Sequence, residues 1–163
     1  MKVLIQRVSQ ANVDVVDPMS RQVDQSFDPQ EIHRGLLLLV GVSNADGEQE
    51  VAYAARKIAN MRIFEDTNGR MNRSVIDVTG EILSISQFTL YADTRHGNRP
   101  SFHNAGKPDH AETVWNNFNR TLSTYGIPVK TGRFGAHMRV QLLNDGPVTI
   151  SLDTAETQRS QQP

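Results

Sequence analysis

Cysteine is absent from the 163 residues of the chain. A disulfide, a thiolate zinc site and a cysteine nucleophile are therefore excluded. An excess of one charge is also missing, because 17 Lys and Arg nearly balance 18 Asp and Glu, for a formal net charge of −1. This balance argues against a protein that coats long stretches of nucleic acid through many phosphate contacts, although it allows a small basic patch that grips one RNA end.

Long apolar runs are missing as well. The longest, residues 36–42, is far shorter than the roughly 20 residues of a membrane-spanning helix. The first eight residues are too few and too charged for a signal peptide. These absences predict a soluble, cytoplasmic protein that does not associate with a membrane.

Several catalytic motifs are not found in the sequence. It has no G-x-S-x-G nucleophile elbow, no Walker loop, no G-x-G-x-x-G and no H-E-x-x-H. His96, His103 and His110 are spaced seven apart, but they cover an expected loop and a helix start, so solvated surface histidines are favoured over a shared metal site. We expect no metal and no other cofactor, while a Ser-His-Asp triad stays open because triads are defined in space.

Apolar patterning predicts several strands. Alternating apolar residues favour a strand over residues 2–8 and a second over residues 11–16. The unbroken run 35–42 predicts a strand buried on both faces. The polar segment 17–33, which contains two prolines, indicates a long surface loop or a hairpin insertion. Further strands are expected over residues 81–90, 129–134, 136–143 and 148–152, with a turn at 144–147.

Two helices are predicted. The first covers residues 46–62, where Asp46 is the expected cap and Gln49 completes a capping-box pattern. The second begins near Pro108, a residue suited to the first helical position, and ends at Gly126. Its apolar stripe consists of Val114, Trp115, Phe118, Leu122 and Tyr125.

These elements show no strict alternation of strand and helix. They therefore predict an α+β fold with a largely antiparallel, curved, barrel-like sheet and two main helices. A single domain is expected over residues 1–152. Residues 153–163 form a polar tail that we expect to be disordered.

Two polar segments are unusual for their places in the chain. Residues 86–90, SQFTL, put three polar side chains at the end of an expected strand, and residues 144–149, NDGPVT, follow another. Taken alone, the first is an ordinary edge strand and the second an ordinary turn.

Together with other segments, however, they resemble the D-aminoacyl-tRNA deacylase family. The resemblance covers residues 2–152 and is carried by IQRV at 5–8, MRIFED at 61–66, SQFTLYAD at 86–93, RPSF at 99–102, TGRFGAHM at 131–138 and NDGPVT at 144–149. It implies an α+β homodimer with two active sites at the subunit interface. The implied reaction is hydrolysis of the ester between a D-amino acid and the 3′ end of tRNA, which is chiral proofreading in translation.

The resemblance also implies the residues of the site. The catalytic residues are placed at Ser86, Gln87, Phe88 and Thr89. Substrate-binding positions are Arg7, Ala105, Gly106, Phe134, Met138, Gly146 and Pro147, although which of Ala105 and Gly106 matches the family's small pocket residue is open. Gly146-Pro147 resembles the family's cis Gly-Pro motif, which each subunit inserts into the other's site.

The backbone properties of glycine and proline make this motif suitable as a chirality filter. Glycine lets the backbone approach a ligand closely, and proline fixes its own φ. Rigid carbonyl groups against the substrate's α-carbon would reject the L side chain by collision, although glycine, which has no side chain, would pass. Backbone N–H groups of Phe88 and Thr89 are expected to form an oxyanion hole. A water molecule is favoured as the nucleophile over the Thr89 hydroxyl, because the sequence places no base beside that hydroxyl.

The loop over residues 94–107 is interpreted as an RNA contact. It carries Arg95, Arg99 and Lys107, which we expect to bind phosphates of the tRNA acceptor end. A plain solvated loop is the simpler alternative. Two other functions also stay open, namely a non-catalytic RNA-end-binding module and a general esterase that uses Thr89.

The sequence departs from the family pattern at three places. Residues 17–33 are longer than the family shows, Tyr91 stands where a small residue is expected, and residues 154–163 have no counterpart. None of these departures touches the polar strand end or the Gly-Pro step.

Overall fold

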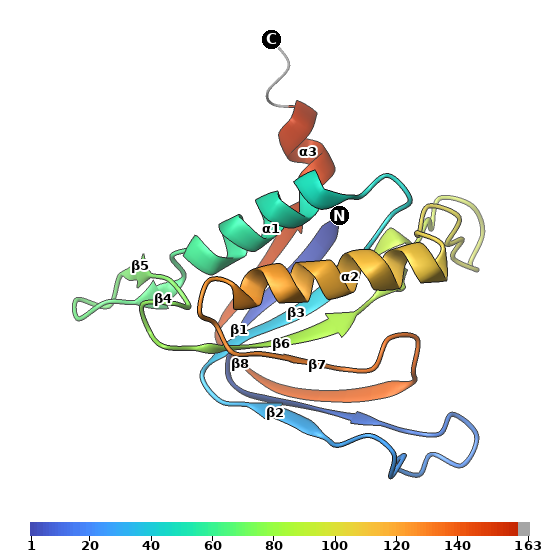
Figure 1. The fold of residues 1–163 in the computed structure, drawn as a ribbon, viewed down its shortest axis with the longest axis horizontal. Helices are drawn as coiled ribbons and strands as arrows, with labels where there is room; N and C mark the ends of the chain where they lie inside the picture. The colour runs from blue at the N-terminus through green and yellow to red at the C-terminus, as the bar shows by residue number, and fades with distance from the viewer. Residues whose placement is uncertain (160–163) are drawn as a thin grey trace.

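The computed structural model describes residues 1–159. Two long helices lie side by side on one face of a strongly curved sheet, as Figure 1 shows. The strands are β1 (Lys2–Val15), β2 (Gln30–Ile32), β3 (Gly35–Gly41), β4 (Phe64–Glu65), β5 (Met71–Arg73), β6 (Glu81–Ser86), β7 (Val129–Thr131) and β8 (Met138–Asp153). The helices are α1 (Glu48–Asn60), the short 3₁₀ helix η1 (Phe88–Tyr91), α2 (Pro108–Ser123) and α3 (Thr154–Arg159).

Two long antiparallel strands organise the sheet. β1 pairs with β8 from Lys2 to Val15 with local interruptions at Arg7 and Ser9, and its other edge pairs with β3 and then with β2. The predicted break between residues 8 and 11 is absent, because β1 runs as one strand of 14 residues. The local register shifts there instead, and the buried side chains change core: Val3 and Ile5 belong to one apolar cluster, whereas Val8, Ala11 and Val13 belong to another.

The other half of the sheet is parallel. β3 pairs with β6, and β6 pairs with β7, in parallel register. Parallel neighbours need a crossover, and α1 and α2 lie within the two crossovers on the same face of the sheet (Figure 1). The predicted α+β class with a curved, barrel-like sheet is therefore confirmed, with a mixed sheet.

The sheet separates two apolar cores. The larger core lies beneath the helices and includes Phe64, Trp115 and Phe118. The smaller one lies on the opposite face, where Leu37, Leu83 and other buried side chains pack together. Because β3 contributes to both, the prediction of a strand buried on two faces is confirmed.

A wide bulge interrupts the pairing of β1 with β8. Gln6 lies opposite Thr149, and Val8 lies opposite Asn144, so residues 145–148 stand opposite Arg7 alone. The prediction of two strands separated by a turn at residues 144–147 is wrong, since β8 runs as one strand through this stretch. Proline has no N–H for the ladder, which explains why the strand leaves its pairing here.

The start of α1 also differs from the prediction. Gly47 is the cap, and its N–H donates to the carboxylate of Glu50 at 2.9 Å. Asp46 does not cap the helix. Its carboxylate pairs with the α-amino group of Met1 and accepts hydrogen bonds from the Ser43 N–H and the Tyr91 hydroxyl.

The C-terminal segment is ordered through residue 159. The prediction of disorder from residue 153 onward is wrong for Asp153, which ends β8, and for Thr154–Arg159, which form α3. The rest of that prediction lies outside the described residues. Within residues 1–159, no helix is long and apolar enough to cross a membrane.

Candidate active site

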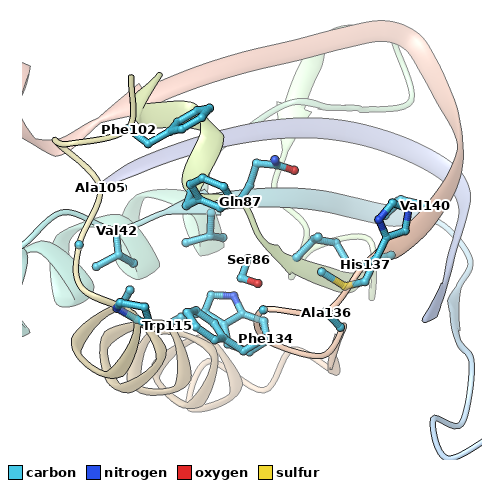
Figure 2. Close-up of a pocket in the computed structure, with 18 residues that line it drawn as sticks. Val42, Ser86, Gln87, Phe102, Ala105, Trp115, Phe134, Ala136, His137 and Val140 are labelled. Carbon is cyan, nitrogen blue, oxygen red and sulfur yellow. The ribbon is translucent and has the colours of Figure 1, made fainter. Parts of the chain in front are cut away.

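A cavity of about 610 Å³ lies where β6 ends, between the sheet and α2 (Figure 2). Most of its lining is apolar or aromatic, which is typical of small-molecule and cofactor pockets. The lining residues are Val40, Val42, Ile85, Ser86, Gln87, Phe88, Phe102, Ala105, Gly106, Pro108, Ala111, Trp115, Phe134, Gly135, Ala136, His137, Met138 and Val140.

The polar strand end opens into this cavity. β6 stops at Ser86, and the Gln87 N–H still donates to the Val40 carbonyl at 2.7 Å before the chain turns into η1. The predicted strand over residues 81–90 is therefore too long. The side chains of Ser86, Gln87 and Phe88 line the cavity, whereas Thr89 is exposed on η1 and is not part of the lining.

The floor of the cavity is held by a buried hydrogen bond. The Trp115 indole N–H donates to the Ser84 hydroxyl at 3.0 Å, and both residues are buried. The ring of Trp115 lies 5.9 Å from that of Phe134, so α2 and the segment after β7 meet beneath Ser86 (Figure 2). The sequence assigned Trp115 only to an apolar stripe of the helix.

One side of the cavity is closed by backbone. The Gly106 N–H donates to the Val42 carbonyl at 2.8 Å. A Cβ at Gly106 would lie 3.1 Å from that oxygen, so a side chain would fit there only if the Val42–Ser43 backbone moved by a few tenths of an ångström. Both Ala105 and Gly106 line the cavity, which brings the two candidate positions for the small pocket residue together.

Two aromatic rings mark the rim. Phe88 and Phe102 meet edge to face with ring centroids 5.0 Å apart, and both remain exposed. Apolar rings exposed next to a cavity are typical of surfaces that stack a planar ligand. Phe102 belongs to the RPSF motif, which sequence reasoning used only for the resemblance.

The predicted Gly-Pro step lies outside the cavity of its own chain. Gly146 and Pro147 are exposed on the bulge of β8, and the peptide bond between them is cis. Arg7 holds the bulge, since its Nε donates to the Asp145 carbonyl at 2.9 Å and its Nη1 donates to the Ile63 carbonyl at 2.8 Å. The structure thus brings Arg7 to the Gly-Pro step, but it brings neither to Ser86–Phe88 of the same chain.

Gly146 is tied to its position by geometry. Its φ is +131°, and a Cβ would lie 2.8 Å from Val148 Cγ2 and 3.0 Å from an Arg7 nitrogen. Any other residue would displace either the bulge or its anchor.

Among the residues that the structure describes, no base contacts the hydroxyl of Thr89. The Gln87 side-chain amide donates a short hydrogen bond to Thr89 Oγ1. An amide N–H is a donor and cannot accept the hydroxyl proton, so this contact does not activate Thr89 as a nucleophile.

The basic loop is only partly free for a ligand. Arg95 forms a bidentate ion pair with Asp93, and this contact holds the pKa of Asp93 well below its usual range. Arg99 is exposed, and the Lys107 N–H donates to Asn44 next to the cavity wall. Tyr91 packs beneath this loop, where burial and the nearby Asp46 carboxylate raise the pKa of its hydroxyl.

Residues that the sequence did not single out complete the lining. Val42, Pro108, Ala111, His137 and Val140 all contact the cavity. His137 lies in the TGRFGAHM motif beside the predicted Met138, and Pro108 and Ala111 open the helix that carries Trp115, so these three could have been found from their predicted neighbours.

The fold and the site together define a single-domain α+β protein whose ligand pocket is built around a polar strand end. A family model described as D-Tyr-tRNA(Tyr) deacylase matches residues 4–153. The chain belongs to this family of enzymes.

Relatives of known name agree with this assignment. A protein of Bifidobacterium adolescentis named D-aminoacyl-tRNA deacylase is 61% identical over 156 residues, which are 96% of this chain and 98% of the relative. One of Bifidobacterium longum with the same name is 59% identical over 94% of each chain. The resemblance stated from the sequence motifs is confirmed.

Two solved structures share the fold. A structure titled c-Myc DNA Unwinding Element Binding Protein superposes with a TM-score of 0.82 at 41% identity and covers 94% of this chain and 99% of its own. A structure titled as an analysis of a probable eukaryotic D-amino acid tRNA deacylase gives a TM-score of 0.76 at 16% identity, covering 93% of this chain and 97% of its own. The second likeness is one of fold alone.

Proposed function

We propose that this protein hydrolyses the ester bond of D-aminoacyl-tRNA in the cytoplasm and releases a free D-amino acid and tRNA. The observation that carries the proposal is the placement of Ser86, Gln87 and Phe88 on the wall of the aromatic cavity. These residues form the motif that the family resemblance assigns to the reaction, and the chain is 61% identical to a named deacylase over nearly its whole length.

The cavity suits the terminal nucleoside of tRNA. Its volume of about 610 Å³ and its apolar lining fit one purine and its ribose better than a helix or a peptide. Trp115, Phe134 and the rim rings of Phe88 and Phe102 supply aromatic surface. Stacking of a base on an aromatic ring typically contributes about 1–3 kcal/mol. The ester would then lie beside the end of β6.

Backbone groups and water carry the reaction in this proposal. The first N–H groups of a helix have no partner within it, and Phe88 and Thr89 begin η1. Their N–H groups would stabilise the oxyanion of the tetrahedral intermediate, where one donor is worth about 3 kcal/mol. Within residues 1–159 the side-chain partner of the Thr89 hydroxyl is an amide donor rather than a base, so a water molecule is the better nucleophile.

Chiral selection would come from a second copy of the chain. Gly146 and Pro147 project from β8, away from the cavity of their own chain, and Arg7 fixes them from behind. In a homodimer with its sites at the interface, each subunit's step would face the substrate's α-carbon in the other subunit. The L side chain would collide with rigid carbonyl groups, while the D side chain and glycine would pass.

The acceptor strand would cross the basic loop. Arg99 and Lys107 are the cations best placed to meet phosphates, and Arg95 would reach a phosphate only in competition with Asp93. Each phosphate contact contributes to the salt dependence of binding, so removing Arg99 should reduce that dependence.

The test compares D-tyrosyl-tRNA with L-tyrosyl-tRNA under identical conditions. The proposal expects release of tyrosine from the D substrate only. Release from neither would indicate a non-catalytic RNA-end-binding module, and release from both at similar rates would indicate a general esterase. Either result would overturn the proposed function.

A further inference from the structure

The polar segment 17–33, which the sequence indicated as a surface loop or hairpin insertion, lies against one wall of the cavity. We define the pocket wall as residues 134–138, all of which line the cavity. The segment 17–29 leaves β1, returns toward β2 and contacts both ends of this wall. Its contacts are not used in the proposed reaction.

The first contact point is Arg133, directly before the pocket wall. Arg133 Nη1 donates to the Asp24 carboxylate at 2.6 Å, and Nη2 donates to the carbonyl and hydroxyl oxygens of Ser26 at 3.0 and 3.1 Å. The guanidinium also lies 5.4 Å from the ring centre of Phe27. Arg133 is therefore held on three sides by one segment.

The second contact point is His137, at the far end of the pocket wall. The Val16 N–H donates to the His137 carbonyl at 2.9 Å. Arg21 Nη1 lies 3.1 Å from His137 Nε2, and because arginine can only donate, the imidazole accepts. Arg21 adopts a φ of +61°, an uncommon conformation for a residue other than glycine.

The segment is fixed to the body of the protein rather than only to the wall. The Asp24 N–H donates to the Val15 carbonyl at 2.9 Å, which ties it to the end of β1. Phe27 packs against the smaller core together with Met138. A wall attached at both ends to an anchored segment cannot shift without breaking these contacts.

We infer that Arg133 is a positioning residue: the 17–29 segment grips it and so sets the distance of the pocket wall from Trp115 and Ser86. The inference rests on the proposed function, because the ligand in question is the terminal nucleoside of aminoacyl-tRNA. Loosening the wall weakens binding of that nucleoside. It leaves the chemistry at the end of β6 unchanged, since Arg133 and Asp24 do not line the cavity.

The test uses Asp24→Asn and Arg133→Gln, with Asp28→Asn as the matched control. Asp28 lies in the same segment, and its replacement removes the same charge, but its carboxylate makes no ion pair or hydrogen bond among the described contacts of residues 1–159. Each of the two test variants should raise KM for D-tyrosyl-tRNA about fivefold while kcat stays within about twofold. The control should match the unchanged enzyme in both constants.

A reversed pair provides the rescue. Asp24→Arg combined with Arg133→Asp restores an ion pair in the opposite sense, so its KM should lie below that of either single change. Equal KM values in the test and control variants would overturn the inference. The inference would also be overturned if the KM of the double variant were no lower than the KM of Asp24→Arg alone and of Arg133→Asp alone.

Trp115 gives a readout that does not need activity. It is the only tryptophan in the chain, and it is 3% exposed at the floor of the cavity. Quenching of its fluorescence by acrylamide should increase in Asp24→Asn and Arg133→Gln but not in Asp28→Asn. Unaltered quenching in the test variants would overturn the positioning role. If the protein without any substitution lacked deacylase activity, only the proposed function would be overturned.

Discussion

The buried hydrogen bond beneath the cavity provides the sharpest test of the fold's energetics. Replacing Ser84 by Ala removes the acceptor of the Trp115 indole N–H without adding bulk. Ser84 is 0% exposed and Trp115 is 3% exposed, so no water replaces the hydroxyl without disturbing the packing. A buried donor left unsatisfied costs about 1–3 kcal/mol.

We therefore expect Ser84→Ala to lower the free energy of unfolding by about 2 kcal/mol. For a chain of this size, that change corresponds to a fall in Tm of roughly 4–8 °C. Urea unfolding followed by Trp115 fluorescence measures the change directly, because no second tryptophan contributes to the signal.

A double-mutant cycle isolates the hydrogen bond from other effects. Trp115→Phe removes the indole N–H and with it the fluorescent probe, so unfolding of all four proteins in the cycle is followed by far-UV circular dichroism. The further replacement of Ser84 by Ala should then cost much less than it does beside tryptophan. If Ser84→Ala changes stability by less than about 0.5 kcal/mol, or costs the same with Phe at position 115, the reasoning is refuted.

The remaining predictions concern activity and pH. Thr89→Ala should keep most of the deacylase activity, and its complete loss in a folded variant would instead make Thr89 the nucleophile. Gly106→Val should raise KM at least tenfold, because a side chain would separate residue 106 from the backbone of Val42. Unchanged kinetics would contradict the view that this close backbone approach shapes the cavity. Arg95 lowers the pKa of Asp93, so the ion pair stabilises the fold fully above about pH 4 and loses its effect as pH falls further. Asp93→Asn should therefore lower Tm at pH 7 and have less effect at pH 3, and an equal difference at both pH values would refute this.

Much of the architecture follows from periodicity. The helices at α1 and α2, the buried strand β3 and the curved α+β sheet were predicted from apolar spacing, the proline at position 108 and the run of four leucines. These features depend on local sequence and on burial, both of which leave a regular pattern.

The failures have a common physical cause, which is long-range pairing. The turn expected at residues 144–147 is a bulge because β1 continues to pair with β8 on both sides of it. Asp46 does not cap α1, since its carboxylate is recruited by Met1 and Tyr91 from distant parts of the chain. Neither partnership is visible in a local window of sequence.

The candidate site also divides into residues that local motifs predicted and residues whose roles depend on long-range contacts. The motifs placed Ser86, Gln87 and Phe88 together, and the structure brings them to one cavity. Trp115 could be assigned only to a helix stripe, and the contacts of Arg133 with the 17–29 segment could not be assigned at all. A side chain's role as a pocket floor or an anchor depends on which segments fold against it, and the sequence alone does not specify this.

The bulge has a consequence for how this family could diversify. Because the ladder of β1 and β8 resumes on each side of it, a change within residues 145–148 displaces the bulge and its Arg7 anchor before it alters the register of the flanking strands. The register of the scaffold is thereby separated from the shape of this exposed step, so a substitution that abolishes the proposed chiral selection would leave the paired strands on either side in place.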